Sequence, residues 1–362
     1  MRIILMLVLT VFTLGGCAAR EAEPETAPAF EEILKIDIHA HIFEYIPGFA
    51  EMLSRNKLCL LNICVPASDP VQMKWMEETA ELLYQKYGSI HPFASTFPVY
   101  GLFEPDYAAK AISWLDKSFE QGAVMTKIWK EVGMEIKTPG GEFVMPDDER
   151  LDPIYSYLAG RGKPIIAHLA EPIIAWLPLE PGDTVSYYAT HPEWHFYGKE
   201  GFPSYEQIIR ARDNILKKHP DLVFIGAHMG SMSHDVDMVA ERLEKYPNFF
   251  AGIGGRTGFL ARQPKEKVRD FFIRFSDRIM YGTDIGRVPG KHGEIDPQKR
   301  DEFFEGVLAR YRTEYQYYAG QGRMEYRGRQ VECLGLPRAV LEKIYSANAR
   351  RIIPGLDKIL AE

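Results

Sequence analysis

Leu34-Lys35-Ile36-Asp37-Ile38-His39-Ala40-His41 is the stretch that decides the fold and the chemistry of this chain. Its apolar pattern predicts a buried strand, and residues two apart on a strand point to the same face. His39 and His41 therefore leave the end of the strand side by side, as two ligands of one metal ion would. Histidines that serve only the structure would show the same spacing, so the interpretation depends on the rest of the chain.

Composition bounds the class of protein. The chain has 362 residues, of which 46% are hydrophobic and 26% charged, as in ordinary soluble globular proteins. That length suits two average domains or one α/β barrel with insertions. The net charge of -7 and the lack of a basic tract argue against a nucleic-acid partner.

The first residues resemble the signal of a bacterial lipoprotein. Met1-Arg2 gives a positive start, residues 3–14 are apolar but too short to span a bilayer, and Leu14-Gly15-Gly16-Cys17 matches a lipobox. The resemblance implies cleavage of the signal peptide 1–16 and lipidation of Cys17, which would anchor the protein in the membrane of the bacterial cell envelope. Ala18 is not the aspartate that retains such proteins at the inner membrane, which favours the outer one. A plain secretory signal is the alternative.

The remaining chain divides into a flexible tether over 17–32 and a barrel domain over 33–362. Eight buried strands separated by helices indicate a parallel sheet, and eight such units favour an α/β, (β/α)8 TIM barrel over an open sheet. A long insertion over 171–204 predicts a lid or pocket wall, and C-terminal helices over 300–317 and 337–350 are expected to close the barrel. The strands are expected over 34–39, 58–65, 91–96, 123–129, 164–168, 222–228, 249–253 and 278–284, and the other helices over 71–87, 107–121, 151–161, 205–219, 234–246 and 265–275.

Four of these strands end in residues that can bind a metal ion. His39 and His41 end the first strand, His168 the fifth, His228 the sixth and Asp284 the eighth. The carboxyl ends of barrel strands open onto one mouth, where active sites lie, so we expect these side chains to converge. Neutral imidazoles with one carboxylate suit Zn²⁺, and Mn²⁺ or Fe²⁺ could occupy the same place.

These motifs resemble the amidohydrolase superfamily, in particular the amidohydrolase-related branch that includes aminocarboxymuconate-semialdehyde decarboxylase and related aromatic-acid decarboxylases. The resemblance implies that His39, His41, His168 and Asp284 bind a single metal, and that His228 contacts the activated water or the substrate. It extends from Lys35 to Pro354 and rests on residues 36–41, 166–168, 225–230, 281–284 and 347–350.

The resemblance leaves the role of Lys127, in the fourth strand, open. In two-metal members a carboxylated lysine from that strand bridges the metals. Lys127 could instead bind a substrate carboxylate or extend to the barrel mouth. We expect a single metal.

The chemistry follows from the metal. A bound metal would lower the pKa of its water towards ~7. Asp284 could accept the proton and pass it to the leaving group, and His228 could orient the water or polarise a carbonyl.

Asp37 is either an acceptor for an imidazole N–H or a buried acid of structural value only.

Three further groups of residues carry less weight. Arg256, after the seventh strand, either pairs with a substrate carboxylate or makes a surface ion pair. His191 and His195, in the insertion, either reach into the pocket to contact substrate or belong to the loop's own structure. The histidines without a pattern, His91, His219 and His292, are expected to face solvent.

The sequence therefore predicts a metal-dependent hydrolase whose activated water attacks an amide, lactone or ester of a small molecule. Decarboxylation of an aromatic or unsaturated acid by the same site is the alternative, favoured if Lys127 and Arg256 both face the metal. The third interpretation is a non-catalytic lipoprotein that binds a ligand, which predicts that some of the metal-binding residues are missing. The protein could also form a homodimer.

Overall fold

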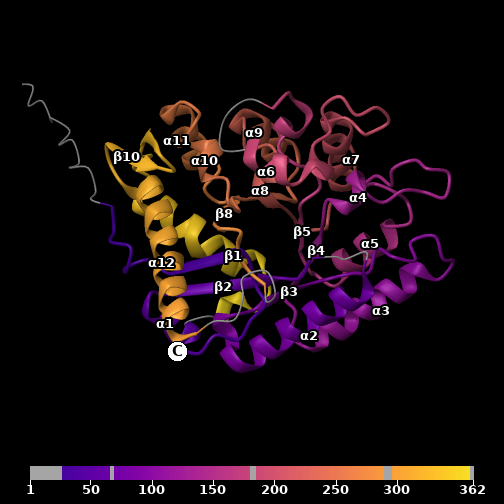
Figure 1. The fold of residues 1–362 in the computed structure, drawn as a ribbon, viewed down its shortest axis with the longest axis horizontal. Coiled ribbons are helices and arrows are strands. Elements are labelled where there is room, and N and C mark those ends of the chain that lie inside the picture. The colour runs from indigo at the N-terminus through magenta and orange to yellow at the C-terminus, as the bar shows by residue number, and fades with distance from the viewer. Residues whose placement is uncertain (1–26, 66–68, 180–184, 289–295, 359–362) are drawn as a thin grey trace, which may run out of the picture.

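The computed structural model describes residues 27–65, 69–179, 185–288 and 296–358. Nine parallel strands form one sheet in the order β8-β7-β6-β5-β4-β3-β2-β1-β9, and helices surround it (Figure 1). The strands are β1 (Lys35–Ile42), β2 (Leu58–Ile63), β3 (Phe93–Thr96), β4 (Met125–Ile128), β5 (Ile165–Ala167), β6 (Phe224–Gly226), β7 (Phe249–Gly252), β8 (Ile279–Met280) and β9 (Ile285–Arg287), with a separate hairpin of β10 (Arg323–Tyr326) and β11 (Arg329–Glu332). The α-helices are α1 (Phe49–Arg55), α2 (Pro70–Tyr87), α3 (Tyr107–Glu120), α4 (Glu131–Met134), α5 (Asp152–Gly160), α6 (Val185–Thr190), α7 (Tyr205–Lys218), α8 (Ala227–Gly230), α9 (Val236–Lys245), α10 (Thr257–Leu260), α11 (Lys265–Arg274), α12 (Pro297–Ala319), α13 (Arg338–Glu342) and α14 (Asn348–Ile352).

The sheet closes on itself beside β1. β8 and β9 stand at opposite ends of the strand order, yet only residues 281–284 separate them in the chain. Across this gap the N–H of Ile38 donates to the carbonyl of Tyr281 (3.1 Å), and the N–H of Asp284 donates to the carbonyl of His39 (2.7 Å). β8 and β9 are thus two pieces of one interrupted eighth strand, and the predicted TIM barrel is confirmed.

The last residues of the chain that the structure describes close one end of the barrel, as expected of the segment over 337–350; the buried residues of the helix expected over 300–317 belong to a different apolar cluster. Ala349, Ile353 and Leu356 belong to the same buried apolar cluster as strand residues such as Ile36 and Met125. Burying such side chains is the main favourable term in folding, at about 25 cal/mol per Å² of apolar surface. With this end sealed, the opposite end of the strands is left for the site.

The chain begins to pack on the barrel before β1, at residues closer to the N-terminus than the sequence predicted. The carbonyl of Pro28 accepts a hydrogen bond from the hydroxyl of Tyr315 (2.6 Å), and buried Phe30 makes an edge contact with the Tyr315 ring. Residues 28–32, predicted as part of a flexible tether, are therefore docked against the domain. Residues 1–16 and Cys17 lie outside the described residues. Within the part that is described, no helix has the length and apolar character needed to cross a membrane.

Two histidines expected to face solvent are buried. The ring of His91 is fully buried and packs against Phe49 and Tyr87. His219 is 8% exposed, and its Nε2 lies 3.0 Å from a carboxylate oxygen of Asp152. The expectation was wrong because a lone histidine carries no periodic signal of the surface it joins. His292 lies outside the described residues.

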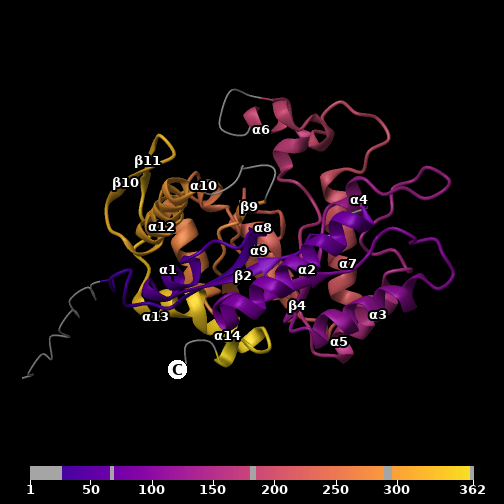
Figure 2. The same cartoon turned by 60° about the horizontal axis from the view of Figure 1, so that its bottom comes forward.

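The insertion predicted as a lid or pocket wall contains α6 and two short 3₁₀ turns, Ile173–Trp176 and Pro192–Trp194. Figure 2 shows α6 standing apart from the ring of helices. The β10–β11 hairpin was not predicted; its turn residues, Arg327 and Gly328, both have positive φ (51° and 74°), as two-residue hairpin turns require.

Candidate metal centre and cavity

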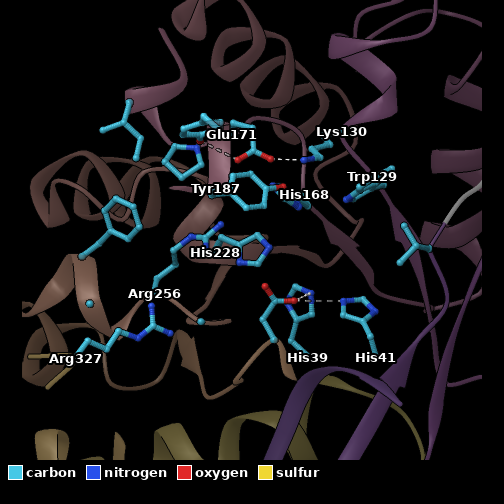
Figure 3. Close-up of a pocket in the computed structure, with 18 of the residues that line it drawn as sticks. His39, His41, Trp129, Lys130, His168, Glu171, Tyr187, His228, Arg256 and Arg327 are labelled. Carbon is cyan, nitrogen blue, oxygen red and sulfur yellow. Dashed lines mark hydrogen bonds and ion pairs between the residues drawn. The ribbon is translucent and has the colours of Figure 1, made fainter. Parts of the chain in front are cut away.

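A cavity of about 1010 Å³ lies at the carboxyl ends of the strands. The insertion supplies part of its wall through Glu171 and Tyr187, and the hairpin supplies another part through Arg327 (Figure 3). The lining also contains the residues predicted to carry the chemistry, which are His39, His41, Lys127, His168, His228 and Asp284.

Two of these residues have a left-handed backbone. The φ angles are 57° at His228 and 59° at Asp284, a conformation that is uncommon outside glycine, costs about 1–3 kcal/mol and clusters at functional sites. At His228 it continues through Ser231, forming the tight turn α8. The buried guanidinium of Arg212 donates to the carbonyl of Gly230 (2.6 Å) and holds this turn.

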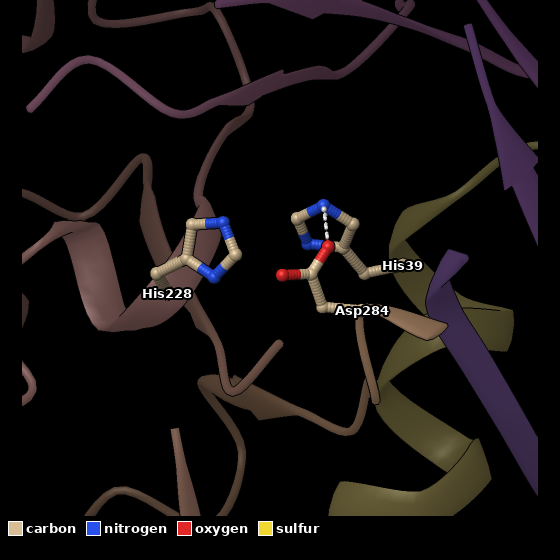
Figure 4. A group of neighbouring side chains, drawn as sticks. All are labelled: His39, His228 and Asp284. Carbon is tan, nitrogen blue, oxygen red and sulfur yellow. Dashed lines mark ion pairs between the residues drawn. The ribbon is translucent and has the colours of Figure 1, made fainter. Parts of the chain in front are cut away.

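The tightest group of metal-binding side chains contains His39, His228 and Asp284, whose ligand atoms all lie within 4.8 Å of one another (Figure 4). The Nε2 atoms of His39 and His41 approach the same Asp284 oxygen, at 3.5 and 3.4 Å. The ring of His168 lies beside that of His228, with centroids 4.3 Å apart. The structure therefore gathers all five residues, with His228 nearer the centre than the resemblance implied.

Backbone carbonyls orient two of the imidazoles. The Nδ1 atoms of His228 and His41 lie 2.6 Å from the carbonyl of Gly254 and 2.9 Å from that of Ile63. Because a carbonyl only accepts, each Nδ1 carries the proton and each Nε2 keeps its lone pair, as in metal-binding histidines. Gly254 has a φ of +36°, and a Cβ there would lie 2.7 Å from Nδ1 of His39. Only glycine lets this strand end approach so closely.

The donor set fits a divalent cation. Burial lowers the pKa values of His39, His168 and His228 well below 6.5, and nearby positive charges act in the same direction, so these rings are neutral. Nδ1 of His39 and Nε2 of His168 are buried and have no hydrogen-bond partner among the described residues. Such orphaned atoms are rare and need an explanation. A metal ion held by neutral imidazoles and Asp284 would supply one.

Asp284 is an ionised carboxylate. Burial alone would raise its pKa, but neighbouring groups that include the Arg256 guanidinium outweigh this effect and lower it below its usual value. An ionised acid beside neutral imidazoles can bind a cation or accept a proton from water.

Lys127 lies beside this centre. Its side chain is 1% exposed, so it does not extend to solvent, and its Nζ lies 3.5 Å from Nε2 of His39. Burial lowers the pKa of Lys127 to about 7; Asp284 opposes this shift and Arg256 adds to it. A substantial fraction of Lys127 is therefore a neutral amine at neutral pH.

Asp37 accepts hydrogen bonds from backbone N–H groups and hydroxyls, and not from an imidazole N–H. Its carboxylate accepts hydrogen bonds from the N–H of His39 (2.8 Å), the N–H of Thr283 (3.1 Å), the hydroxyl of Thr283 and the hydroxyl of Tyr311 (2.6 Å). It thereby ties β1 to the residue before Asp284 and to α12. Of the two roles left open by the sequence, the structure supports the structural one.

We expect Asp37→Ala to lower the free energy of unfolding by about 4 kcal/mol or more, because it leaves several buried donors without an acceptor, each costing ~1–3 kcal/mol. Tyr311→Phe removes one donor only and should cost about 1–2 kcal/mol. Urea unfolding followed by circular dichroism measures both. A cost below 1 kcal/mol for the alanine variant, on the same ~1–3 kcal/mol scale, would show that Asp37 is not this tie.

A second buried polar cluster was missed by sequence reasoning. Lys130, directly after β4, pairs with Glu171, after β5. Glu171 also accepts from the hydroxyl of Tyr188 in α6 (3.1 Å), and the Lys130 ammonium lies 3.7 Å from the centroid of the Trp194 ring. This cluster attaches the insertion to the barrel. No motif marks it, because the partners are far apart in sequence.

Glu171→Gln should therefore destabilise the protein by about 3 kcal/mol, the order found when one partner of a buried ion pair is removed. Glu193→Gln, in the exposed part of the same insertion, should change stability by less than about 0.5 kcal/mol. Thermal unfolding of the two variants tests this, and limited proteolysis should cut within the insertion faster in Glu171→Gln. Equal melting temperatures would contradict the attachment.

The remaining predicted residues fall in different places. Arg256 is half-buried and lines the cavity; the surface ion pair weighed against it is not found among the described residues. His191 is exposed and stacks on Tyr187, and Nε2 of His195 lies 3.0 Å from the carbonyl of Leu177. Neither histidine is among the described residues that line the cavity, because each is held by its own segment.

Comparisons with known proteins found a matching family model and several similar solved structures. The family model described as amidohydrolase matches residues 97–355. Similar solved structures include 4-oxalomesaconate hydratase from Rhodopseudomonas palustris (16% identity, 89% of this chain and 96% of that one, TM-score 0.50). Others are 5-carboxyvanillate decarboxylase from Novosphingobium aromaticivorans with bound manganese (14%, 90% and 98%, 0.48) and an amidohydrolase from Burkholderia multivorans with bound zinc (12%, 89% and 100%, 0.46). A search of curated proteins found no match.

Histidines and an acid converge on one cavity at the strand ends of a closed parallel barrel. This arrangement is typical of barrel proteins built around a metal centre. The family match covers most of the chain. The chain belongs to the amidohydrolase family.

Proposed function

We propose that the protein is a metal-dependent hydrolase that cleaves an amide, lactone or ester of a small molecule. The observation that supports this most strongly is the convergence of His39, His228 and Asp284 within 4.8 Å at the wall of a large cavity. His41 and His168 lie beside this group. All five predicted residues line the same cavity, which supports an enzyme over the non-catalytic alternative.

The residues of the site have different roles in the proposed reaction. The imidazoles of His39, His41, His168 and His228 and the carboxylate of Asp284 would together hold one divalent cation, for which zinc is our choice. The metal would supply a water whose pKa is lowered towards ~7. Asp284, ionised beside the imidazoles, accepts the proton of that water and returns it to the leaving group.

Decarboxylation is the second candidate, and one observation favours it. Lys127 and Arg256 both line the cavity, and the charge of Arg256 contributes to the lowered pKa of Lys127. They could hold a carboxylate close to the metal centre. This arrangement would suit the decarboxylase-like branch that the sequence resembles.

Isotope labelling separates the two reactions. The zinc- and manganese-loaded protein is screened against esters, lactones, amides and aromatic acids in water enriched in ¹⁸O. A hydrolase incorporates ¹⁸O into the product, whereas a decarboxylase releases CO₂ and takes a solvent proton at carbon. ¹⁸O in the organic product supports hydrolysis. CO₂ release with an unlabelled organic product contradicts hydrolysis and supports decarboxylation. Failure to bind a metal would overturn both.

We also propose that Cys17 is lipidated and holds the enzyme in the bacterial cell envelope. The support is the lipobox-like Leu14-Gly15-Gly16-Cys17 after an apolar run. Expression in a bacterial host should place the full chain in the membrane fraction, and Cys17→Ser should release it. Recovery of both forms as soluble protein would overturn the proposal.

A further inference from the structure

The cavity has an excess of positive charge that the whole chain lacks. The chain carries a net charge of -7, yet the described lining residues include six basic side chains, of which Lys127 is only partly charged, and four carboxylates. The cations are Lys127, Lys130, Arg256, Arg262, Arg327 and Arg329, and the acids are Asp69, Glu131, Glu171 and Asp284. A bound divalent metal would increase this excess. A cavity of one sign attracts ligands of the opposite sign.

Most of these cations have a partner. Lys130 pairs with Glu171, Lys127 lies against the metal-binding histidine His39, and Arg262 and Arg329 have interactions of their own. Arg256 and Arg327 differ, because the contacts of their guanidinium groups are with the neighbouring rings of Phe259 and Tyr326, each 5.7 Å from the ring centroid. Among the described residues, no carboxylate lies within ion-pair distance of either guanidinium.

Arg256 is placed for a ligand by the barrel itself. It lies four residues after the end of β7, and Figure 3 shows its side chain extending towards His228. Its Nε is buried and has no hydrogen-bond partner in the part of the chain that the structure describes. A buried guanidinium donor without an acceptor is costly. An anionic ligand would supply the acceptor.

Arg327 comes from the hairpin on the same side of the cavity. It lines the cavity and occupies the first turn position with a φ of 51°. This conformation favours Asn, Asp or Gly, so arginine is an unfavourable choice for the turn. Figure 3 shows its guanidinium on the same side of the cavity as Arg256, away from His41.

We propose that Arg256 and Arg327 form an anion-binding subsite, so that the substrate is an organic acid whose carboxylate or phosphate-like group lies at the β10–β11 hairpin while its reacting carbon lies at the metal centre. This inference rests on the proposed function for the position of the reacting carbon. It adds the class of substrate and names Arg327 as a specificity-determining residue. Arginine suits this role because its planar fork can bind such a group through two hydrogen bonds.

Calorimetric titration of the zinc-loaded protein tests the subsite without turnover. The probes are isophthalate, which is rigid, and adipate, which is flexible and spans several distances, each paired with its monoamide. The wild type should bind at least one dianion about tenfold more tightly than its monoamide. Arg327→Gln should weaken that dianion by about ten- to hundredfold, as expected for hydrogen bonds to a charged group, and should change the monoamide little. Arg323→Gln removes a charge from an exposed position of the same hairpin outside the cavity lining and should leave both affinities unchanged.

Three results would overturn the proposal: equal affinity of the wild type for dianion and monoamide, equal weakening of both by Arg327→Gln, or no binding of any probe at millimolar concentration. Repeating the titration with metal-free protein separates this inference from the proposed function. The effect of Arg327→Gln on the dianion should persist there. A protein that binds no metal but keeps this effect would contradict the proposed hydrolase and leave the anion subsite standing.

Discussion

Asp284→Asn should reduce kcat by about 10³-fold, within the ~10²–10⁴ range that a general acid–base group contributes. The amide keeps the size of the side chain and one oxygen but cannot accept the proton of a water. Its effect should therefore fall on kcat and leave KM within a small factor. Steady-state kinetics on the substrate found by the labelling screen would measure this.

The control for Asp284→Asn is Asp296→Asn. Asp296 is an exposed residue that caps α12 by accepting from the N–H of Lys299 (2.9 Å), and asparagine caps a helix equally well. It should keep full activity. The metal content of both variants is measured in parallel, because loss of metal from Asp284→Asn would assign its effect to binding. An Asp284→Asn enzyme that keeps its metal and works within tenfold of the wild type would refute the proton-transfer role.

The second large effect is expected from the metal. Zinc at a thousandfold excess over its Kd should stabilise the metal-free protein by about 4 kcal/mol, since it binds only the folded state. His39→Ala and His228→Ala should each abolish the rise in Tm and reduce bound zinc to a small fraction per chain. Differential scanning calorimetry and elemental analysis after chelation and reloading are the measurements.

Single alanine variants of His41 and His168 then decide the ligand set. If the group of His39, His228 and Asp284 holds the ion by itself, these variants keep their zinc; if they are ligands, as the resemblance implied, zinc is lost. His191→Gln, on the exposed part of the insertion, should behave as the wild type. An equal rise in Tm for His39→Ala and the wild type would show that the metal, if bound, lies elsewhere.

The sequence predicted the barrel because its signals are local. Each strand is a short apolar run, and the helices between them are amphipathic, so all eight barrel strands lie where they were expected. The polar residues at the strand ends, His39 and His168 among them, follow from the same pattern, because parallel strands present their carboxyl ends at one mouth. Convergence of the site was therefore a consequence of the fold.

What the sequence could not predict depends on backbone conformations and on pairings between distant residues. The left-handed backbone of His228 moves its ring into the centre of the site, and no residue type announces it. The ion pair of Lys130 and Glu171 joins two strand ends 41 positions apart. The β10–β11 hairpin was missed because arginine stands where its turn would favour asparagine.

The break in the eighth strand makes one residue contribute both to the chemistry and to the closure of the barrel. Asp284 supplies the carboxylate to the imidazoles, and its backbone N–H joins the last strand to the first through the carbonyl of His39. Its left-handed φ could be adopted with less strain by glycine, which would remove the acid. Selection for heat resistance alone would then favour an inactive protein at this position, so stability and turnover oppose each other at the seam of the barrel.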